Sequence, residues 1–263
     1  MNRHADSPMS MTSPRTTLTR GQYAPLLYRS CAAPHSTLPQ RSRAEFLRRD
    51  LRQRADYFAN PSIERTLANM KVAAAQREDC HSIAAIHVQS WQAGYSSLFP
   101  TEYLDSLSVA EREESWISIL ATSASRTLVA KRGGASLGFI TFGRCRDEGA
   151  GASKGEVWAL YVAPQDWSSG VGWALWEAAR VLMLHQGFTE VSLWMLSGNA
   201  RGLRFYESVG FRREPNSEQF FERGGTKLAE VRLVFSGMSA SPSIERTSSG
   251  RLRLPTAAAR VKR

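Results

Sequence analysis

Short apolar runs alternate with amphipathic stretches between residues 70 and 235 of the 263-residue chain. The runs are rich in β-branched and aromatic residues, which is typical of buried strands. They cover residues 70–75, 127–131, 137–143, 156–162, 191–195 and 226–235. Between them, apolar residues recur at intervals of three and four, the spacing of a helix with one face packed on a sheet. This pattern predicts an α/β domain over residues 70–236.

Capping and turn residues indicate where several elements begin and end. Ser108 is followed three positions later by Glu111, a capping-box pattern that predicts the start of a helix. Two glycines at residues 133–134 separate two of the strands and predict a tight hairpin turn. Residues 145–154 and 212–225 carry no periodic pattern, and we expect loops there.

A further helix is expected immediately after residue 170, and its apolar residues fall on one face. That face contains Val171, Ala174, Leu175, Ala178, Val181 and Leu182. Trp173 and Trp176 lie off this predicted core face, so they are a candidate surface for a homodimer.

A glycine turn at residues 167–172, with the sequence WSSGVG, joins the strand at residues 156–162 to this helix. Small residues leading into a helix N-terminus direct several free backbone N–H groups to one point, which favours a phosphate or pyrophosphate. A Walker loop does not fit, because no Lys-Ser/Thr pair follows the second glycine. A dinucleotide-binding turn fits poorly, because Leu175 stands where Gly or Ala is required.

A third phosphate-loop pattern fits better. Residues 167–172 resemble the acyl-CoA loop of the GNAT N-acyltransferases, Gln/Arg-x-x-Gly-x-Gly/Ala, at both glycines. Residues 199–211 resemble the Asn…Phe-Tyr-x-x-x-Gly-Phe signature of the same superfamily, and residues 91–108 resemble a segment of its small-molecule enzymes. The resemblance implies the GNAT acyl-CoA N-acyltransferase fold, a mixed α/β architecture with a mostly antiparallel central sheet and helices on both faces.

The resemblance also implies acetyl-CoA as co-substrate, held by loop amides and by the preceding strand. The expected cofactor-binding residues are Leu160, Val162, Trp167, Ser168, Ser169, Gly170, Val171, Gly172 and Asn199. Trp167 and Ser168 depart from the Gln/Arg and Gly of the family pattern, so the loop lacks a cationic or amide side chain. Asn199 is also placed to cap the helix that follows it, and capping alone would account for it.

Acyl transfer to an amine needs a proton for the departing thiolate and an acceptor for the amine proton. The resemblance assigns the donor role to Tyr206, since a phenol with a pKa of about 10 is protonated at neutral pH. Packing on an apolar helix face is the alternative for this tyrosine. Glu156 is the candidate base, with a purely structural surface carboxylate as the alternative. Trp91 and Tyr95 are expected to wall the acceptor pocket or, equally, to pack in the core.

The function prediction is therefore an N-acetyltransferase that transfers an acetyl group from acetyl-CoA to the primary amine of a small molecule. A protein N-terminal or lysine acetyltransferase and a non-catalytic acyl-CoA sensor are the alternatives. No metal is expected, because the three cysteines lack metal-ligand spacing, and reduced thiols suit a cytoplasmic location. No apolar run reaches the roughly 18 residues of a membrane helix, so no membrane partner is expected.

The net charge of +10 belongs to the ends of the chain. Residues 70–236 carry 17 basic and 18 acidic residues, whereas residues 1–69 carry 11 and 5, and residues 237–263 carry 6 and 1. A basic excess confined to the tails argues only weakly for a nucleic-acid partner, so none is expected, and nucleic-acid binding by the tails is the alternative. Residues 1–69 and 237–263 are predicted to be a disordered basic extension and a disordered basic tail.

The hexapeptide PSIERT occurs at residues 61–66 and again at residues 242–247. Two copies this far apart are not the pattern of a repeat protein. The tail from Pro242 onwards resembles the translated recombination sites that flank integron gene cassettes, which would make the duplication a trace of DNA history. A paired basic docking peptide is the alternative.

Overall fold

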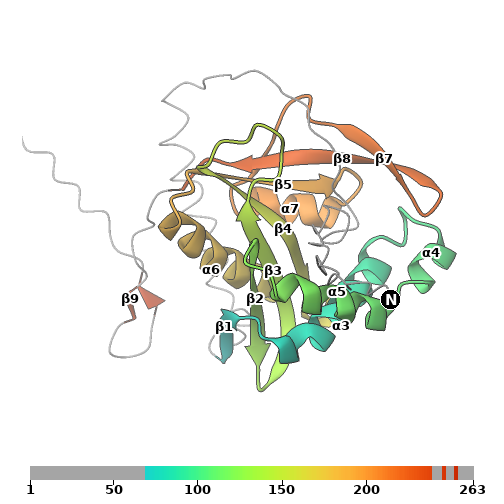
Figure 1. Ribbon diagram of the computed structural model, residues 1–263, viewed down its shortest axis with the longest axis horizontal. Helices are drawn as coiled ribbons and strands as arrows, with labels where there is room; N and C mark the ends of the chain where they lie inside the picture. Colours follow the sequence, from blue (N-terminus) through green and yellow to red (C-terminus); the bar gives the residue numbers. More distant parts are fainter. Residues whose placement is uncertain (1–68, 239–244, 247–251, 254–263) are drawn as a thin grey trace, which may run out of the picture.

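The computed structural model describes residues 69–238, 245–246 and 252–253 of the chain. Its main strands are β1 (Met70–Ala74), β2 (Ser125–Arg132), β3 (Ala135–Arg144), β4 (Lys154–Val162), β5 (Glu190–Leu196), β6 (Arg212–Arg213), β7 (Gln219–Arg223) and β8 (Thr226–Phe235). They form one sheet in the order β1-β2-β3-β4-β5-β8-β6, with β7 also paired to β8 (Figure 1). Only the β4–β5 pairing is parallel, which confirms the mostly antiparallel sheet.

Helices cover both faces of this sheet, as predicted (Figure 1). They are α3 (Cys80–Gly94), α4 (Thr101–Asp105), α5 (Val109–Leu120), α6 (Val171–His185) and α7 (Ala200–Ser208), with short 3-10 turns η2 (Arg77–Asp79) and η3 (Pro164–Asp166). Alternate strand positions divide the core in two: Ile140 packs with α6, and its neighbour Phe139 packs with α3 and α5. The sheet is therefore a wall between two apolar layers.

Local chemistry sets several element ends as the sequence predicts. The Ser108 hydroxyl accepts a hydrogen bond from the Glu111 backbone N–H at 3.3 Å, at the start of α5. The hairpin between β2 and β3 turns at Gly133 and Gly134, whose φ angles of 57° and 87° favour glycine.

The segment at residues 212–225, expected to be a loop, contains two strands. β6 pairs with the end of β8, and β7 forms a hairpin with β8 that turns at Gly224 and Gly225. The loop prediction was wrong because β7, QFFER, is a mostly polar edge segment with no core-facing alternation of apolar residues. A short helix, α4, likewise lies within residues 91–108.

The buried face of α6 differs from the predicted one. Its buried residues are Val171, Leu175, Trp176, Ala179, Arg180 and Met183. Trp176 is only 1% exposed and packs between Phe211 and Phe235, with ring centroids 4.9 and 5.3 Å away. Val181, a member of the predicted core face, is 43% exposed. The expected Trp173–Trp176 surface is therefore absent, because the C-terminal strand and the turn after α7 cover that side of the helix.

The predicted N-terminal extension, the tail and the two PSIERT copies lie almost entirely outside the described residues. Within the tail, β9 (Glu245–Arg246) and β10 (Leu252–Arg253) pair as a separate two-stranded sheet. Among the described residues, no helix has the length and apolar character needed to cross a membrane.

Candidate active site

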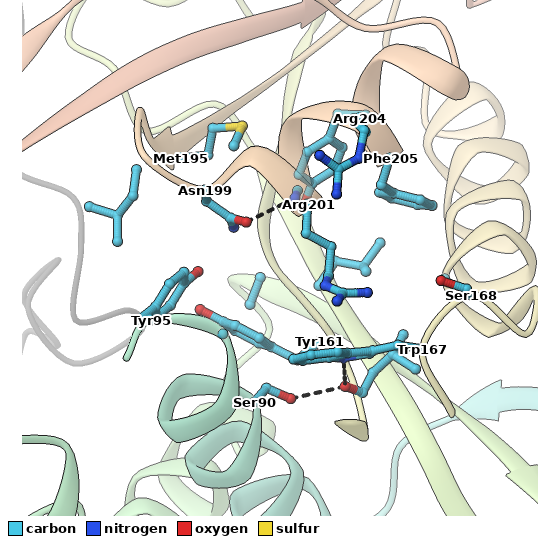
Figure 2. Close-up of a pocket in the computed structure, with 18 of the residues that line it drawn as sticks. Ser90, Tyr95, Tyr161, Trp167, Ser168, Met195, Asn199, Arg201, Arg204 and Phe205 are labelled. Carbon is cyan, nitrogen blue, oxygen red and sulfur yellow. Dashed lines mark hydrogen bonds between the residues drawn. The ribbon is translucent and has the colours of Figure 1, made fainter. Parts of the chain in front are cut away.

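The parallel strands β4 and β5 pair over only three positions, residues 154–156 with residues 190–192. Beyond this point the edge of β4 that faces β5 has no strand partner, from residue 157 to residue 162. A cavity of about 750 Å³ occupies this opening, lined by parts of α3, β4, β5, α7 and the turn before α6 (Figure 2). The sheet thus provides free backbone groups along one wall of a large cavity.

The turn before α6 keeps a backbone suited to a phosphate loop. Gly170 has a φ of 94° and immediately precedes α6, whose first N–H groups have no side-chain cap. Ser168 also has a positive φ, 62°, so a serine occupies a conformation that favours glycine. The departure from the family pattern at Ser168 therefore changes the side chain and leaves the loop conformation in place.

Gly172 is required for a contact between two helices. A Cβ atom at Gly172 would lie 3.3 Å from Cε2 of Phe205 on α7, closer than most real contacts. The missing side chain lets α7 approach the first turn of α6, which brings the residues of α7 to the cavity.

Trp167 is tied to the end of β4. Its indole N–H donates a hydrogen bond of 2.7 Å to the Val162 carbonyl, and the Ser90 hydroxyl donates to the same carbonyl at 3.0 Å. The Val162 carbonyl, one of the groups expected to pair with a pantetheine arm, is therefore already an acceptor for two protein donors.

α7 contributes cationic side chains that the sequence interpretation missed. Asn199 caps the helix by accepting a 2.8 Å hydrogen bond from the Gly202 N–H, as predicted. Arg201 and Arg204 both line the cavity, and the Arg201 guanidinium lies over the Trp167 ring at 4.2 Å from its centroid (Figure 2). Both arginines are visible in the sequence, but the contact of Arg201 with a loop more than 30 residues earlier depends on tertiary packing.

Tyr206 also lines the cavity from α7. Its ring contacts Phe205 and Phe211, with centroids 5.2 and 5.5 Å away. Burial raises the pKa of its phenol above the ordinary value for tyrosine, and the nearby Tyr161 adds to this effect. The phenol is therefore protonated at neutral pH.

Of the two aromatic residues at the end of α3, Trp91 packs in the core and Tyr95 lines the cavity. Trp91 is buried, outside the cavity lining, and donates a 2.9 Å hydrogen bond to the Tyr161 hydroxyl. Tyr95 lines the cavity and packs at right angles to Trp91, with centroids 5.1 Å apart. Burial raises the pKa of Tyr95, as does the nearby Tyr161. Tyr161, which the sequence interpretation did not single out, thus links the core to the cavity wall.

Glu156 lies away from the cavity lining and is 1% exposed. Its carboxylate accepts hydrogen bonds from the Arg146 side chain at 2.5 and 3.2 Å and from the Arg146 backbone N–H at 2.8 Å. This pairing occupies both oxygens, so the carboxylate holds the β3–β4 connection in place. Its predicted role as a base stays a prediction that this environment does not favour.

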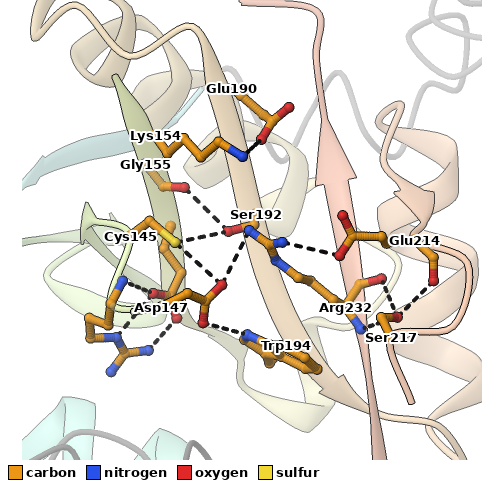
Figure 3. Close-up of polar contacts among 12 residues, drawn as sticks. Cys145, Asp147, Lys154, Gly155, Glu190, Ser192, Trp194, Glu214, Ser217 and Arg232 are labelled. Carbon is orange, nitrogen blue, oxygen red and sulfur yellow. Dashed lines mark hydrogen bonds and ion pairs between the residues drawn. The ribbon is translucent and has the colours of Figure 1, made fainter. Parts of the chain in front are cut away.

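A second group of polar residues fixes the rest of the β3–β4 loop (Figure 3). Asp147 pairs with Arg232 of β8 at 3.2 Å and accepts a 3.2 Å hydrogen bond from the Trp194 indole of β5. Arg232 also pairs with Glu214 at 3.1 Å. Because Trp194 lines the cavity, the loop is anchored directly to the cavity wall.

The cavity brings together most of the residues that the sequence singled out. Its lining includes Leu160, Val162, Trp167, Ser168, Gly170, Gly172, Asn199, Tyr95 and Tyr206. Ser169, Val171, Trp91 and Glu156 do not line it, and the Ser169 hydroxyl instead donates a 2.6 Å hydrogen bond to the Asp166 carbonyl. In the described part of the chain, no group of three or more His, Cys, Asp or Glu residues could hold a metal ion.

Comparison with known proteins identifies relatives of this domain. The "Uncharacterized N-acetyltransferase YuaI" of Bacillus subtilis is 34% identical over 167 residues, which are 63% of this chain and 92% of that protein. A mycothiol acetyltransferase of Thermobispora bispora is 35% identical over 86 residues, which are 32% of this chain and 29% of that protein. The second match is therefore to a part of a longer relative.

Solved structures share the fold at low sequence identity. The PaiA N-acetyltransferase of Thermoplasma acidophilum, solved in complex with coenzyme A, is 21% identical with a TM-score of 0.52. The match covers 64% of this chain and 98% of that protein. The model of the Acetyltransferase (GNAT) family matches residues 80–211, which are half of the chain and include every residue that lines the cavity. The chain belongs to the GNAT family and is an acyltransferase.

Proposed function

We propose that this chain transfers an acetyl group from acetyl-CoA to the primary amine of a small molecule. The observation that carries the proposal is the cavity at the opening between β4 and β5, where an unpaired strand edge and a helix N-terminus converge with the Tyr206 phenol. Acetyl-CoA supplies the thioester from which the acetyl group comes.

The residues present fit such a co-substrate. The unpaired edge of β4 offers backbone groups to an extended amide-containing arm, and the first N–H groups of α6 suit a pyrophosphate. The complex of PaiA with coenzyme A supports the same use of this fold. Leu160, Gly170 and Gly172 are the residues proposed to lie along the arm and the pyrophosphate.

Tyr206 is the proposed proton donor for the departing thiolate. Its phenol faces the same cavity as the loop, and its raised pKa keeps it protonated at the pH of catalysis. For the amine proton, Glu156 remains the residue proposed from the sequence, although its pairing with Arg146 leaves little capacity to accept one. Release to a cavity water is the route that this pairing favours.

A small acceptor is favoured by the aromatic cluster that packs behind Tyr95, which lines the cavity. Phe99, between α3 and α4, and Tyr103 of α4 belong to one apolar cluster with Phe221 of the β7–β8 hairpin. Gly224 of that hairpin lies so close to Tyr103 that a Cβ atom there would overlap its ring. A protein acceptor would require an open groove, whereas here α4 and the hairpin meet.

The test is release of coenzyme A by the full-length chain from acetyl-CoA. Amino acids, polyamines and aromatic amines would be compared with peptides that carry a free N-terminus or a lysine. Turnover with a small amine, at least tenfold above any peptide, is the expected result. Faster turnover of peptides would contradict the small-molecule assignment and support a protein N-terminal or lysine acetyltransferase. Uptake of coenzyme A without turnover of any acceptor would favour the sensor.

A further inference from the structure

The turn that begins α6 lacks the side chain with which the family pattern opens its acyl-CoA loop. Trp167 stands at that position and directs its N–H to the Val162 carbonyl, so it offers no donor to a phosphate. The backbone amides alone would have to hold a pyrophosphate there. A cationic side chain near these amides would strengthen their binding of a pyrophosphate.

Arg201 is placed to supply that charge. It projects from the first turn of α7 into the cavity, and its guanidinium is stacked on the Trp167 ring at 4.2 Å (Figure 2). Stacking fixes the plane of the guanidinium and leaves its N–H groups at the edge free to donate. Among the described residues, Arg201 makes no ion pair, in contrast to Arg132 of β2, which pairs with Asp166 at 3.0 Å.

The surroundings favour an anion beside Arg201. The N-terminus of α6 adds its positive dipole end, and Ser168, next to Trp167, also faces the cavity. The one carboxylate in the cavity lining, Asp166, is already paired with Arg132. In the described structure, the loop amides, the N-terminus of α6 and the Arg201 guanidinium therefore face a cavity that has no unpaired carboxylate to repel an anion.

We propose that Arg201, held in place by Trp167, binds the pyrophosphate of acyl-CoA and takes over the role of the side chain missing from the loop. Trp167 acts as a positioning residue, because it touches the guanidinium and the Val162 carbonyl. The inference rests on the proposed use of acetyl-CoA. The phosphate chemistry is shared by two parts of coenzyme A, the pyrophosphate and the 3′-phosphate, and the experiment must separate them.

The experiment measures binding by calorimetry with the full-length chain, using coenzyme A, 3′-dephospho-coenzyme A and pantetheine. Arg201→Ala is expected to weaken binding of both nucleotide ligands about tenfold or more and to leave pantetheine unchanged. Arg126→Ala is the matched control, since it removes the same charge from an exposed position on β2 outside the cavity. Its affinities should equal those of the wild type.

A second variant tests whether Arg201 takes over the role of the side chain missing from the loop. Trp167→Arg restores a residue of the family pattern, so in the Arg201→Ala background it is expected to recover most of the lost affinity. Unchanged binding of coenzyme A by Arg201→Ala would overturn the proposal. A loss with coenzyme A but not with the dephospho ligand would place Arg201 at the 3′-phosphate and overturn the pyrophosphate assignment. If the wild type binds none of these ligands, the proposed function itself fails.

Discussion

Tyr206 is the residue at which chemistry and binding can be separated. Replacement by Phe keeps the ring that contacts Phe205 and Phe211 and removes only the hydroxyl. We expect the rate of acyl transfer to fall about a hundredfold or more, because the thiolate then leaves without a positioned proton. Coenzyme A release under saturating substrate measures this rate.

Two further measurements on Tyr206→Phe decide between catalysis and packing. The affinity for coenzyme A and the thermal midpoint are expected to stay at wild-type values. Burial raises the pKa of Tyr206, so its phenol should keep its proton through the pH range in which an ordinary tyrosine ionises. The wild-type rate should therefore not fall in that range through loss of this proton. A loss of stability matching the loss of activity would return Tyr206 to a packing role.

Ser168 gives a prediction about the backbone of the cofactor turn. Its φ of 62° is costly for a residue with a side chain, so Ser168→Gly should raise the free energy of unfolding by about 0.5–1 kcal/mol. The adjacent Ser169→Gly is the control. It removes the 2.6 Å hydrogen bond to the Asp166 carbonyl and should lower stability by about 1 kcal/mol. Urea unfolding of both variants measures the two effects, and equal shifts would contradict the assigned strain.

Caps and turns could be predicted from the sequence, because they depend only on residues close to one another in the chain. The Ser108 cap and the glycine turn at residues 133–134 need only neighbouring residues, and both formed as expected. The contact between Arg201 and Trp167 could not be predicted, because it depends on how closely α7 approaches the turn across Gly172. The roles of the cavity residues in binding and catalysis stay predictions.

At the scale of elements, α6 shows what an apolar pattern leaves open. Its sequence has apolar residues on most of its circumference, so periodicity alone did not fix which side faces the core. The C-terminal strand and the turn after α7 together enclose Trp176, while Val181 is exposed. β7 shows the opposite case, a strand with too little apolar content to be recognised before its pairing with β8 is known.

The orientation of α6 can be tested by a pair of truncations. Trp176→Ala should lower the free energy of unfolding by about 3–5 kcal/mol, because it empties the space between Phe211 and Phe235. Val181→Ala removes an apolar side chain from the same helix at an exposed position and should change stability by less than about 0.5 kcal/mol. Denaturant unfolding followed by fluorescence or circular dichroism compares them. Similar losses for both would contradict the observed orientation.

For the whole molecule, Glu230 links stability to pH. This β8 residue is 1% exposed, and burial raises its pKa from 4.5 to about 7, against the opposing effect of a hydrogen bond from Gln219. The charges of Glu156 and Asp147 add to the rise, and Arg146 opposes it. Folding therefore favours the protonated carboxyl, so this residue stabilises the fold most below pH 4.5 and progressively less as the pH rises to about 7.

Glu230→Gln tests this dependence. The variant keeps an oxygen that can accept from Gln219 and removes the charge, so it should be more stable than the wild type at pH 8 by on the order of 1–3 kcal/mol. The difference should shrink towards zero near pH 5. Urea unfolding at both pH values measures it, with Glu222→Gln on the exposed side of β7 as control. A difference independent of pH would contradict the raised pKa.

The architecture of the whole domain was predictable because two motifs lie in the expected order on the expected elements. The boundaries at residues 69 and 237 and the origin of the tail stay predictions, since the flanking segments fall outside the described residues.

The early end of the β4–β5 pairing also has a consequence for solubility. Unpaired strand edges usually invite aggregation, because another molecule can extend the sheet. Here the vacant hydrogen-bonding groups lie in the interior of the strand order, between β4 and β5, and not on an outer border. Only a narrow, flexible chain can enter between two diverging strands, whereas the flat edge of another sheet cannot. The molecule can therefore keep main-chain groups available for a ligand without exposing them to its own copies.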